Sequence, residues 1–426
     1  MHPGIPRQYK TDPVHSCAQC RAARQIPFSM PSAHCACADQ TLAQSSFRGN
    51  NLNGFSLFAV SLAGRTGASC RALLCLSLLP LVAVTTAPVH AHTFCVGTAP
   101  ELTSALVTAA STYQNEDNAI QVKHGTYTGV WTYSVSNTHG ITVSGGYYDF
   151  FGGCVADSLP DPTLTVLDGG DANTVLRITL LPGTSGSVTV TTLTFAHGKE
   201  TFNGYGGGLT VLASGANGGD VLIDRNVFHH NTNTAAIGSS AGLAVSTGGV
   251  ITVRNNLFAN NTANVSSAMN LYNSAGHAYV TNNTVAYNVL TAAPVGNASV
   301  IYSGAGAAYA VFVNNIIVFV NSDVGDDIAL NGRMTLIDND FVASNGAPDG
   351  ASIGNVAVDP KFVDGANGNF RLKPGSSLIN VGDDTTSSLL GGISAYDLDG
   401  DTRTVGTAID LGAYESDVLF ANGFGP

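Results

Sequence analysis

The chain has 426 residues, of which only 11% are charged and 49 are glycine. This low charge and high glycine content are not typical of a helical protein. Frequent threonine, valine and asparagine favour many short strands joined by tight turns. The composition therefore predicts an elongated all-β fold.

Residues 65–91 have the layout of a signal peptide. Arg65 and Arg71 precede an apolar run over residues 72–87, and Val89 and Ala91 place small residues at positions −3 and −1 of a cleavage site. The run is short for a membrane span. We therefore predict an exported protein whose mature form, residues 92–426, has no transmembrane segment.

Residues 1–64 precede this signal and are anomalous in that place. We interpret them as a disordered leader or a misassigned translation start. The pairs Cys17/Cys20 and Cys35/Cys37 have a faint resemblance to zinc-ligand spacing, which is the alternative interpretation.

Of the eight cysteines, Cys95 and Cys154 alone follow residue 91. In an oxidising compartment these two are expected to pair. Residues 92–426 also keep 10 of the 17 basic and 27 of the 29 acidic residues, a net charge of −17. Nucleic acid and anionic membranes are poor partners for such a surface, whereas a cation or a neutral glycan is more easily accommodated.

Residues 92–118 are predicted to form an N-terminal cap. Thr98 and Glu101 resemble a capping box, which marks the start of one short helix. Apolar residues then recur at helical spacing, at Leu102, Ala105, Leu106 and Ala109. After Asn118 the pattern is strand-like, and no second helix is predicted.

Internal repetition is the strongest signal. Asparagines recur at positions 226, 256, 283, 315 and 339, with spacings of 24 to 32 residues. Two positions after each is an apolar residue, Phe228, Phe258, Val285, Ile317 and Phe341, and Phe195 ends an earlier repeat. This variable spacing predicts about eight solenoid coils over residues 119–345, with loops of different lengths. We expect the apolar residues to stack inward and the asparagines to form a ladder at a corner rather than a ligand-binding row.

The tandem N-N-x-[FVI] coils, with Gly206–Leu209 and Ala241–Leu243 between them, resemble the right-handed parallel β-helix repeats of bacterial secreted proteins. Four further segments resemble the C-terminal block of the choice-of-anchor Q family: residues 359–362, 369–380, 397–403 and 409–415. The resemblance implies export to the outer surface or surroundings of a Gram-negative bacterium. It also implies a closing block at residues 346–415 and a sorting-like tail at residues 416–426.

The fold class that follows is an all-β, right-handed parallel β-helix with a short N-terminal capping helix and a C-terminal capping block. We expect it to be monomeric. The capping elements are required because an exposed terminal coil would be an open sheet edge.

A polysaccharide lyase needs a base beside the uronate α-carbon and a positive group for the carboxylate. The candidates are Arg225 and Arg254 on consecutive coils, with His229 and His230 beside the first. Arg225 is one residue before its anchor asparagine and Arg254 is two before, so their side chains are expected to face opposite ways. This offset favours turn residues that face solvent over a catalytic pair.

Glycoside hydrolysis needs carboxylates that converge on the glycosidic bond. Asp323, Asp326 and Asp327 superficially resemble the paired acids of polygalacturonases, but the accompanying motifs of that family are missing, so we expect an exposed acidic loop.

The residues Asp397, Asp399 and Asp401 have the opening ligand spacing of calcium loops. The match to an EF-hand fails because glycine is at the fourth position and Ala408 is at the twelfth. Two interpretations stay open: calcium bound with another geometry, and a tight turn in which Arg403 pairs with a carboxylate.

The sequence thus predicts a secreted or surface-exposed β-helix protein without an evident active site, which contacts glycans or other surface ligands. One alternative is a polysaccharide lyase or another carbohydrate-active enzyme. The other is an adhesin or a structural surface protein.

Overall fold

The computed structural model describes residues 91–416, except 182, 203, 214–217, 238–239, 293–295, 319–324 and 386–392. The leader, nearly all of the signal peptide, Asp323 and the end of the chain from residue 417 are outside these described residues. The predictions made for them therefore stay predictions.

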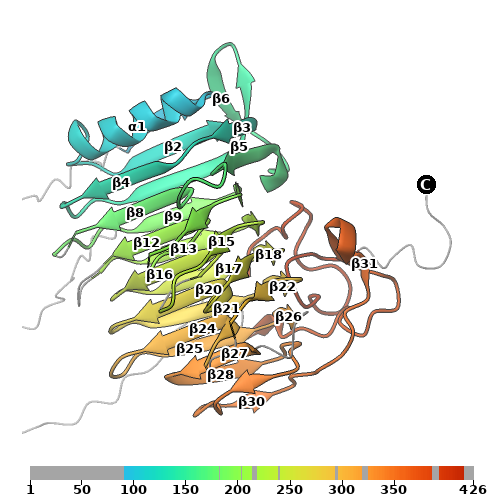
Figure 1. Ribbon diagram of the computed structural model, residues 1–426. Coiled ribbons are helices and arrows are strands. Elements are labelled where there is room, and N and C mark those ends of the chain that lie inside the picture. Colours follow the sequence, from blue (N-terminus) through green and yellow to red (C-terminus); the bar gives the residue numbers. More distant parts are fainter. Residues whose placement is uncertain are drawn as a thin grey trace, which may run out of the picture. The chain divides into compact units, whose positions relative to one another are not determined.

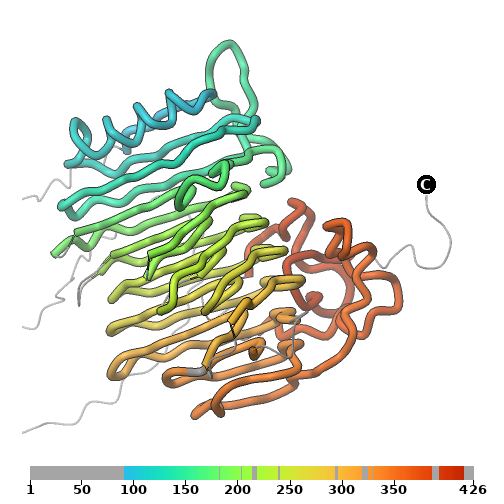
Figure 2. Tube along the Cα trace, in the orientation of Figure 1, coloured from blue at the N-terminus to red at the C-terminus, as the bar shows by residue number. Residues whose placement is uncertain are grey.

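The described residues form a right-handed parallel β-helix of about seven turns, as the sequence predicts, against the eight coils expected (Figure 1). Each coil contributes strands to parallel sheets that run the length of the stack, and the tube in Figure 2 shows the coils following one another in chain order.

The largest sheet is eleven-stranded. It contains β1 (His92–Val96), β2 (Asn118–Lys123), β5 (Ile141–Phe150), β6 (Gly153–Ala156), β9 (Val188–Thr191), β13 (Val221–Asp224), β17 (Ile251–Arg254), β21 (His277–Thr281), β25 (Tyr309–Val313), β28 (Arg333–Ile337) and β30 (Ser352–Ile353). The seven-stranded sheet contains β3 (Gly125–Thr128), β7 (Thr165–Asp168), β10 (Thr194–Ala196), β14 (Val227–His229), β18 (Leu257–Ala259), β22 (Thr284–Ala286) and β26 (Ile316–Val318).

The eight-stranded sheet contains β4 (Trp131–Val135), β8 (Leu176–Leu180), β12 (Leu209–Ala213), β16 (Leu243–Thr247), β20 (Ser266–Asn273), β24 (Ala298–Gly304), β27 (Asp326–Asn331) and β29 (Ser344–Asn345). A four-stranded sheet joins β11 (Lys199–Glu200), β15 (Thr232–Asn233), β19 (Thr262–Ala263) and β23 (Val289–Leu290). Outside the coils, β31 (Phe362–Asp364) and β32 (Asn369–Leu372) form an antiparallel pair, and two short 3₁₀ helices are η1 (Pro162–Leu164) and η2 (Gly365–Asn367).

The helix α1 (Ala99–Ser111) covers the first coil, where Figure 1 shows it lying across the end of the stack. Its N-cap is Thr98, whose hydroxyl accepts a hydrogen bond from the Glu101 backbone N–H. The four apolar residues predicted from helical spacing are its buried residues. The predicted capping helix is therefore confirmed, and it covers a sheet edge that would otherwise be open.

The predicted inward stack is confirmed by strand register. Phe195, Phe228 and Phe258 are direct partners on neighbouring strands, with ring centroids 5.0 and 4.6 Å apart. Val285 and Ile317 continue the same row. Because each coil repeats the position of the last, these side chains make one continuous core along the stack.

The predicted asparagine ladder is also present, and its five predicted members are completely buried. The Nδ2 of Asn226 donates to Oδ1 of Asn256, and the same bond repeats through Asn283, Asn315 and Asn339 at 2.8–3.1 Å. Each Oδ1 also accepts a hydrogen bond from the backbone N–H of the ladder asparagine in the coil before. The ladder extends one step further than predicted, to Asn355.

The left-handed backbone bend at this corner is not at the ladder asparagines themselves. The left-handed residue is the one before each anchor asparagine: Arg225, Asn255, Asn282, Asn314 and Asp338, with φ between 48° and 58°. This separation of roles has a physical reason, because the anchor must direct its amide into the core while its neighbour supplies the turn.

A second ladder was not predicted. Asn231 donates to Asn261, and Asn261 to Asn288, at 3.0 and 2.9 Å. Each lies five residues after a member of the first ladder, so the sequence contains the signal as a second asparagine in the same repeat. The two ladders mark the two ends of the strands in the seven-stranded sheet.

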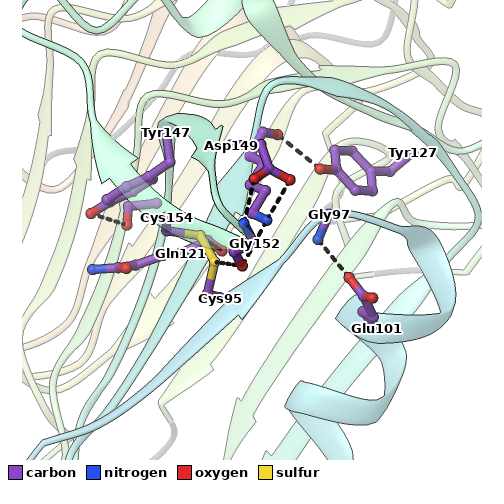
Figure 3. The surroundings of a disulfide bond; sticks show 11 residues. Cys95, Gly97, Glu101, Gln121, Tyr127, Tyr147, Asp149, Gly152 and Cys154 are labelled. Atoms are coloured by element: carbon purple, nitrogen blue, oxygen red, sulfur yellow. Dashed lines mark hydrogen bonds and ion pairs between the residues drawn. A yellow bond between two sulfur atoms is a disulfide. The ribbon is translucent and has the colours of Figure 1, made fainter.

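The predicted disulfide joins Cys95 on β1 to Cys154 on β6 (Figure 3). β6 is the return strand of a hairpin with β5, and Lys123 contacts this hairpin through a 2.9 Å ion pair with Asp149. The disulfide therefore links the hairpin covalently to the first strand of the stack, across 59 residues of sequence.

The closing block predicted at residues 346–415 is only partly at the end of the stack. Its first part adds β30 to the eleven-stranded sheet, and residues 359–416 form what we call the C-terminal segment. We expected it to close the far end of the stack, but its apolar residues pack on the outer face of the seven-stranded sheet. Ile316 of β26 is buried with Leu372 and Leu411. The reason is that the residue between each ladder asparagine and the inward apolar residue points outward. Several of these outward residues are apolar and are buried by the C-terminal segment, which removes them from water: Val227, Leu257 and Ile316.

Side-chain and backbone hydrogen bonds fix this segment to the coils. Asn314 exchanges two hydrogen bonds with the backbone of Asp383, at 2.9 and 2.8 Å, and Thr284 Oγ1 accepts the N–H of Ala413 at 2.9 Å. At Gly412, which has φ of 88°, an added Cβ would be 2.7 Å from that same Oγ1. The close approach therefore requires glycine.

We predict that Asn283→Ala lowers the free energy of unfolding by about 3 kcal/mol, because it leaves buried partners in two neighbouring coils without hydrogen bonds. Urea titration measures the total effect, and native-state hydrogen exchange measures it at the Asn256 N–H, which loses its acceptor. The control is Asn260→Gly, which keeps the left-handed turn and leaves both ladders intact. Unchanged protection of the Asn256 amide in Asn283→Ala would contradict the role assigned to the ladder.

We predict that the double variant Cys95→Ser, Cys154→Ser loses roughly 2–4 kcal/mol of stability at the helix-capped end, because the disulfide restricts the unfolded chain. Hydrogen exchange of β1 and β5 locates the loss, and non-reducing peptide mapping verifies the bond in the wild type. Thr126→Ser, at an exposed position of β3, is the control. Equal protection of β1 in all three proteins would show that the disulfide adds nothing there.

Candidate functional site

The outer face of the eight-stranded sheet holds a groove over β12, β16, β20, β24 and β27. Side chains on these strands alternate between the core and the outside, so every second residue forms the floor of the groove. Register places Leu212, Ser246, Tyr272, Ser303 and Asn331 in one outward row. The row beside it contains Ala244, Asn270 and Ile301.

This groove has a volume of about 480 Å³, and its described lining contains no Asp, Glu, Lys, Arg or His. Its polar atoms are the amides of Asn270 and Asn331 and the hydroxyls of Ser246 and Ser303. Neighbouring strands are about 4.8 Å apart, so these groups are presented at regular intervals along the stack.

Tyr272 is the aromatic group of the groove, and 43% of it is exposed. Its partners on the two neighbouring strands are Ser246 and Ser303, which are too small to cover the ring. An aromatic face flanked by neutral hydrogen-bonding groups is suited to a ligand that has both apolar and hydroxylated surfaces.

Arg177 is on β8, toward the helix-capped end of the same sheet. Its guanidinium lies 4.1 Å from the ring centroid of Tyr205 and forms a 2.9 Å ion pair with buried Glu200. Glu200 also accepts from Thr174 Oγ1 at 2.7 Å. These contacts hold the arginine in place and pair its charge with that of buried Glu200.

The two candidate arginines have different surroundings. Arg254 forms an ion pair with Asp224 at 3.3 Å and lines a shallow depression on the eleven-stranded sheet. Arg225 occupies a left-handed turn, and its guanidinium is 6.0 Å from the ring centroid of Tyr396 in the C-terminal segment. Their contacts give no indication of a shared carboxylate-binding site.

His229 and His230 instead line a pocket of about 330 Å³ between the seven-stranded sheet and the C-terminal segment. Asp161, Arg371 and Asp399 also line it, and Arg371 forms a short two-fold ion pair with Asp399. The positive charge in this pocket is therefore already paired.

The candidate calcium ligands do lie together. Oxygens of Asp397, Asp399 and Asp401 are within 4.8 Å of one another. Asp397 accepts the backbone N–H groups of Asp399, Asp401 and Glu415, at 2.8–2.9 Å. With Asp399 paired to Arg371, two of the three carboxylates have structural partners, and calcium binding stays a prediction.

Arg403 is completely buried. It pairs with the carboxylate of Glu415, and its Nε is 3.8 Å from Glu415 Oε2. Its Nη2 also donates to the carbonyls of Asp410 and Gly412. Burial raises the pKa of Glu415 to about 8 and that of Asp397 to about 6, while the nearby guanidinium acts in the opposite direction. Burial likewise raises the pKa of Asp410.

The expected exposed acidic loop is wrong for Asp327, which is only 1% exposed. Its Oδ2 accepts the backbone N–H groups of Val342 and Ala343 at 2.7 and 3.0 Å, so it organises the next coil. Sequence spacing could not show that the chain returns to this carboxylate fifteen residues later.

The fold and the groove define a parallel β-helix protein, a class that includes surface and carbohydrate-contacting proteins in general. Neither protein-family models nor curated proteins give a match to this chain. No helix in the described residues is long and apolar enough to cross a membrane.

The raised carboxyl pKa of Glu415 predicts a pH dependence. A carboxyl whose pKa is higher in the folded than in the unfolded state contributes stability below the unfolded value, and this is lost as pH rises through the folded value. We expect the melting temperature to fall between pH 5 and pH 8, and to fall less in Glu415→Gln, which cannot ionise. Glu116→Gln is the control. Parallel pH profiles for the wild type and Glu415→Gln would contradict the assignment.

Proposed function

We propose that this chain is an exported, monomeric β-helix protein that binds neutral glycan chains in the groove of the eight-stranded sheet. The observation that carries the proposal is the exposed ring of Tyr272, set among neutral amides and hydroxyls that repeat from coil to coil. Sugars offer apolar ring faces and hydroxyl groups, and this lining complements both.

Electrostatics support a neutral ligand over an acidic one. The groove lining has no charged group among its described residues, and residues 92–426 have a net charge of −17. A polyanion would be repelled by the summed field without finding a cation in the groove.

Export and outer-surface location are supported by the signal-peptide layout of residues 65–91 and by the Cys95–Cys154 disulfide, which is typical of oxidising compartments. The resemblance of the C-terminal segment to the choice-of-anchor Q family supports the same location. We propose membership of that family on these residues.

Binding without turnover is favoured over hydrolysis. Glycoside hydrolysis commonly uses two carboxyl groups on either side of the scissile bond, and the described lining of the groove supplies none. The lyase candidates Arg225 and Arg254 lie outside this lining, and Arg254 is paired with Asp224.

We predict that Tyr272→Ala weakens binding of a neutral oligosaccharide at least about 10-fold, equivalent to about 1.4 kcal/mol, because the stacking surface is lost. Calorimetry on the purified chain with cellohexaose and xylohexaose measures this. The matched control is Tyr148→Ala, since Tyr148 is equally exposed, at 42%, but lies on the β5–β6 hairpin.

The same samples are assayed for products from these oligosaccharides, and for unsaturated uronides from pectate and alginate with calcium present. Binding without product supports the proposal. Release of product would contradict the proposal and show that the chain is a carbohydrate-active enzyme. Equal affinity of Tyr272→Ala and the wild type would exclude the groove as the binding site. Absence of binding to any glycan would favour the adhesin or structural protein.

A further inference from the structure

Three imidazoles from two consecutive coils gather at one corner of the seven-stranded sheet. His197 and His230 occupy equivalent left-handed turn positions, with φ of 49° and 54°, and His229 is the last residue of β14. The ring centroid of His197 is 6.0 Å from that of His229 and 5.8 Å from that of His230. This cluster is separate from the glycan groove, which lies on a different sheet.

The Nδ1 atoms of His229 and His230 are 2.9 Å apart and face each other. An imidazole binds a metal ion through an unprotonated ring nitrogen, so two facing Nδ1 atoms can serve as a pair of ligands.

The surroundings of the pair leave space for an ion and its other ligands. On the neighbouring strands the partners of His229 are Ala196 and Ala259, which are both small. The two histidines line the 330 Å³ pocket beneath the C-terminal segment. His197 Nδ1 lies 3.1 Å from a carboxylate oxygen of Asp168, an arrangement that orients many metal-binding imidazoles.

We propose that His229 and His230 bind a divalent transition-metal ion through their Nδ1 atoms, with His197 as the neighbouring third imidazole. Metal–nitrogen bonds of about 2.0–2.1 Å to two atoms 2.9 Å apart require an angle of about 90° at the metal. Adjacent ligands in square-planar or octahedral geometry have that angle, which favours Cu²⁺ or Ni²⁺. Calcium prefers oxygen ligands, so this site is distinct from the Asp397 cluster.

Neighbouring coils supply substitutions that fit the backbone. His229→Ala introduces alanine, the residue at the equivalent position of both neighbouring strands. His230→Asn introduces asparagine, the residue at the equivalent left-handed position of the next coil, Asn260. Neither change removes a core side chain, so the variants are expected to fold. His139→Ala is the matched control, since that imidazole lies outside the cluster, near Asp117.

Equilibrium dialysis of the full chain against Ni²⁺ tests the proposal. Because residues 1–90 contain other cysteines and histidines, the readout is the difference between variants. We expect the double variant to bind one equivalent fewer than the wild type, each single variant to bind that equivalent at least 10-fold more weakly, and His139→Ala to match the wild type.

Electron paramagnetic resonance with Cu²⁺ supplies a second readout, in which nitrogen hyperfine coupling from at least two imidazoles disappears in the double variant. Circular dichroism verifies that the double variant is folded. The same number of Ni²⁺ ions bound with the same affinity by the double variant and the wild type would overturn the proposal.

Discussion

The structure depends on the hydrogen bonds that the buried asparagines make between coils. A parallel β-helix must turn at the same place in every coil, and the backbone groups at that turn are buried where no water can satisfy them. The asparagine side chain meets both requirements. Its Oδ1 accepts a backbone N–H from the coil before, and its Nδ2 donates to the asparagine Oδ1 of the coil after. Because each amide depends on the next, the ladder fixes the register of the whole stack.

Once register is fixed, each outward position becomes a row, and the chemistry of that row decides what happens to the face. On the seven-stranded sheet the outward row contains Val227, Leu257 and Ile316, which the C-terminal segment buries. On the eight-stranded sheet the equivalent rows carry serine, asparagine and Tyr272, and a groove stays open. A small change in composition thus separates a packing surface from a binding surface.

Periodicity made the fold predictable. The repeated asparagines and the apolar residues two positions later define the coil, the first ladder and the inward stack, and the cysteine count defines the disulfide. The second ladder was visible in the same repeats at a spacing of five residues. The side-on position of the C-terminal segment was not predictable by this route, because it depends on which face lacks cover, and Asp327 contacts residues that only the completed coil brings close.

The candidate sites were harder to predict than the fold, and the reason is geometric. Residues that repeat along strands form rows, so the groove could have been found by aligning the outward positions of each coil. Residues at turns follow the same rule, since each comes at a fixed offset from the strand of its own coil, whatever the length of the loop between coils. His197 and His230 each come two residues after an inward phenylalanine, Phe195 and Phe228, so the alignment of these two coils places both histidines at the same turn. In a solenoid, therefore, the alignment of coils rather than distance along the chain determines which polar side chains can act together.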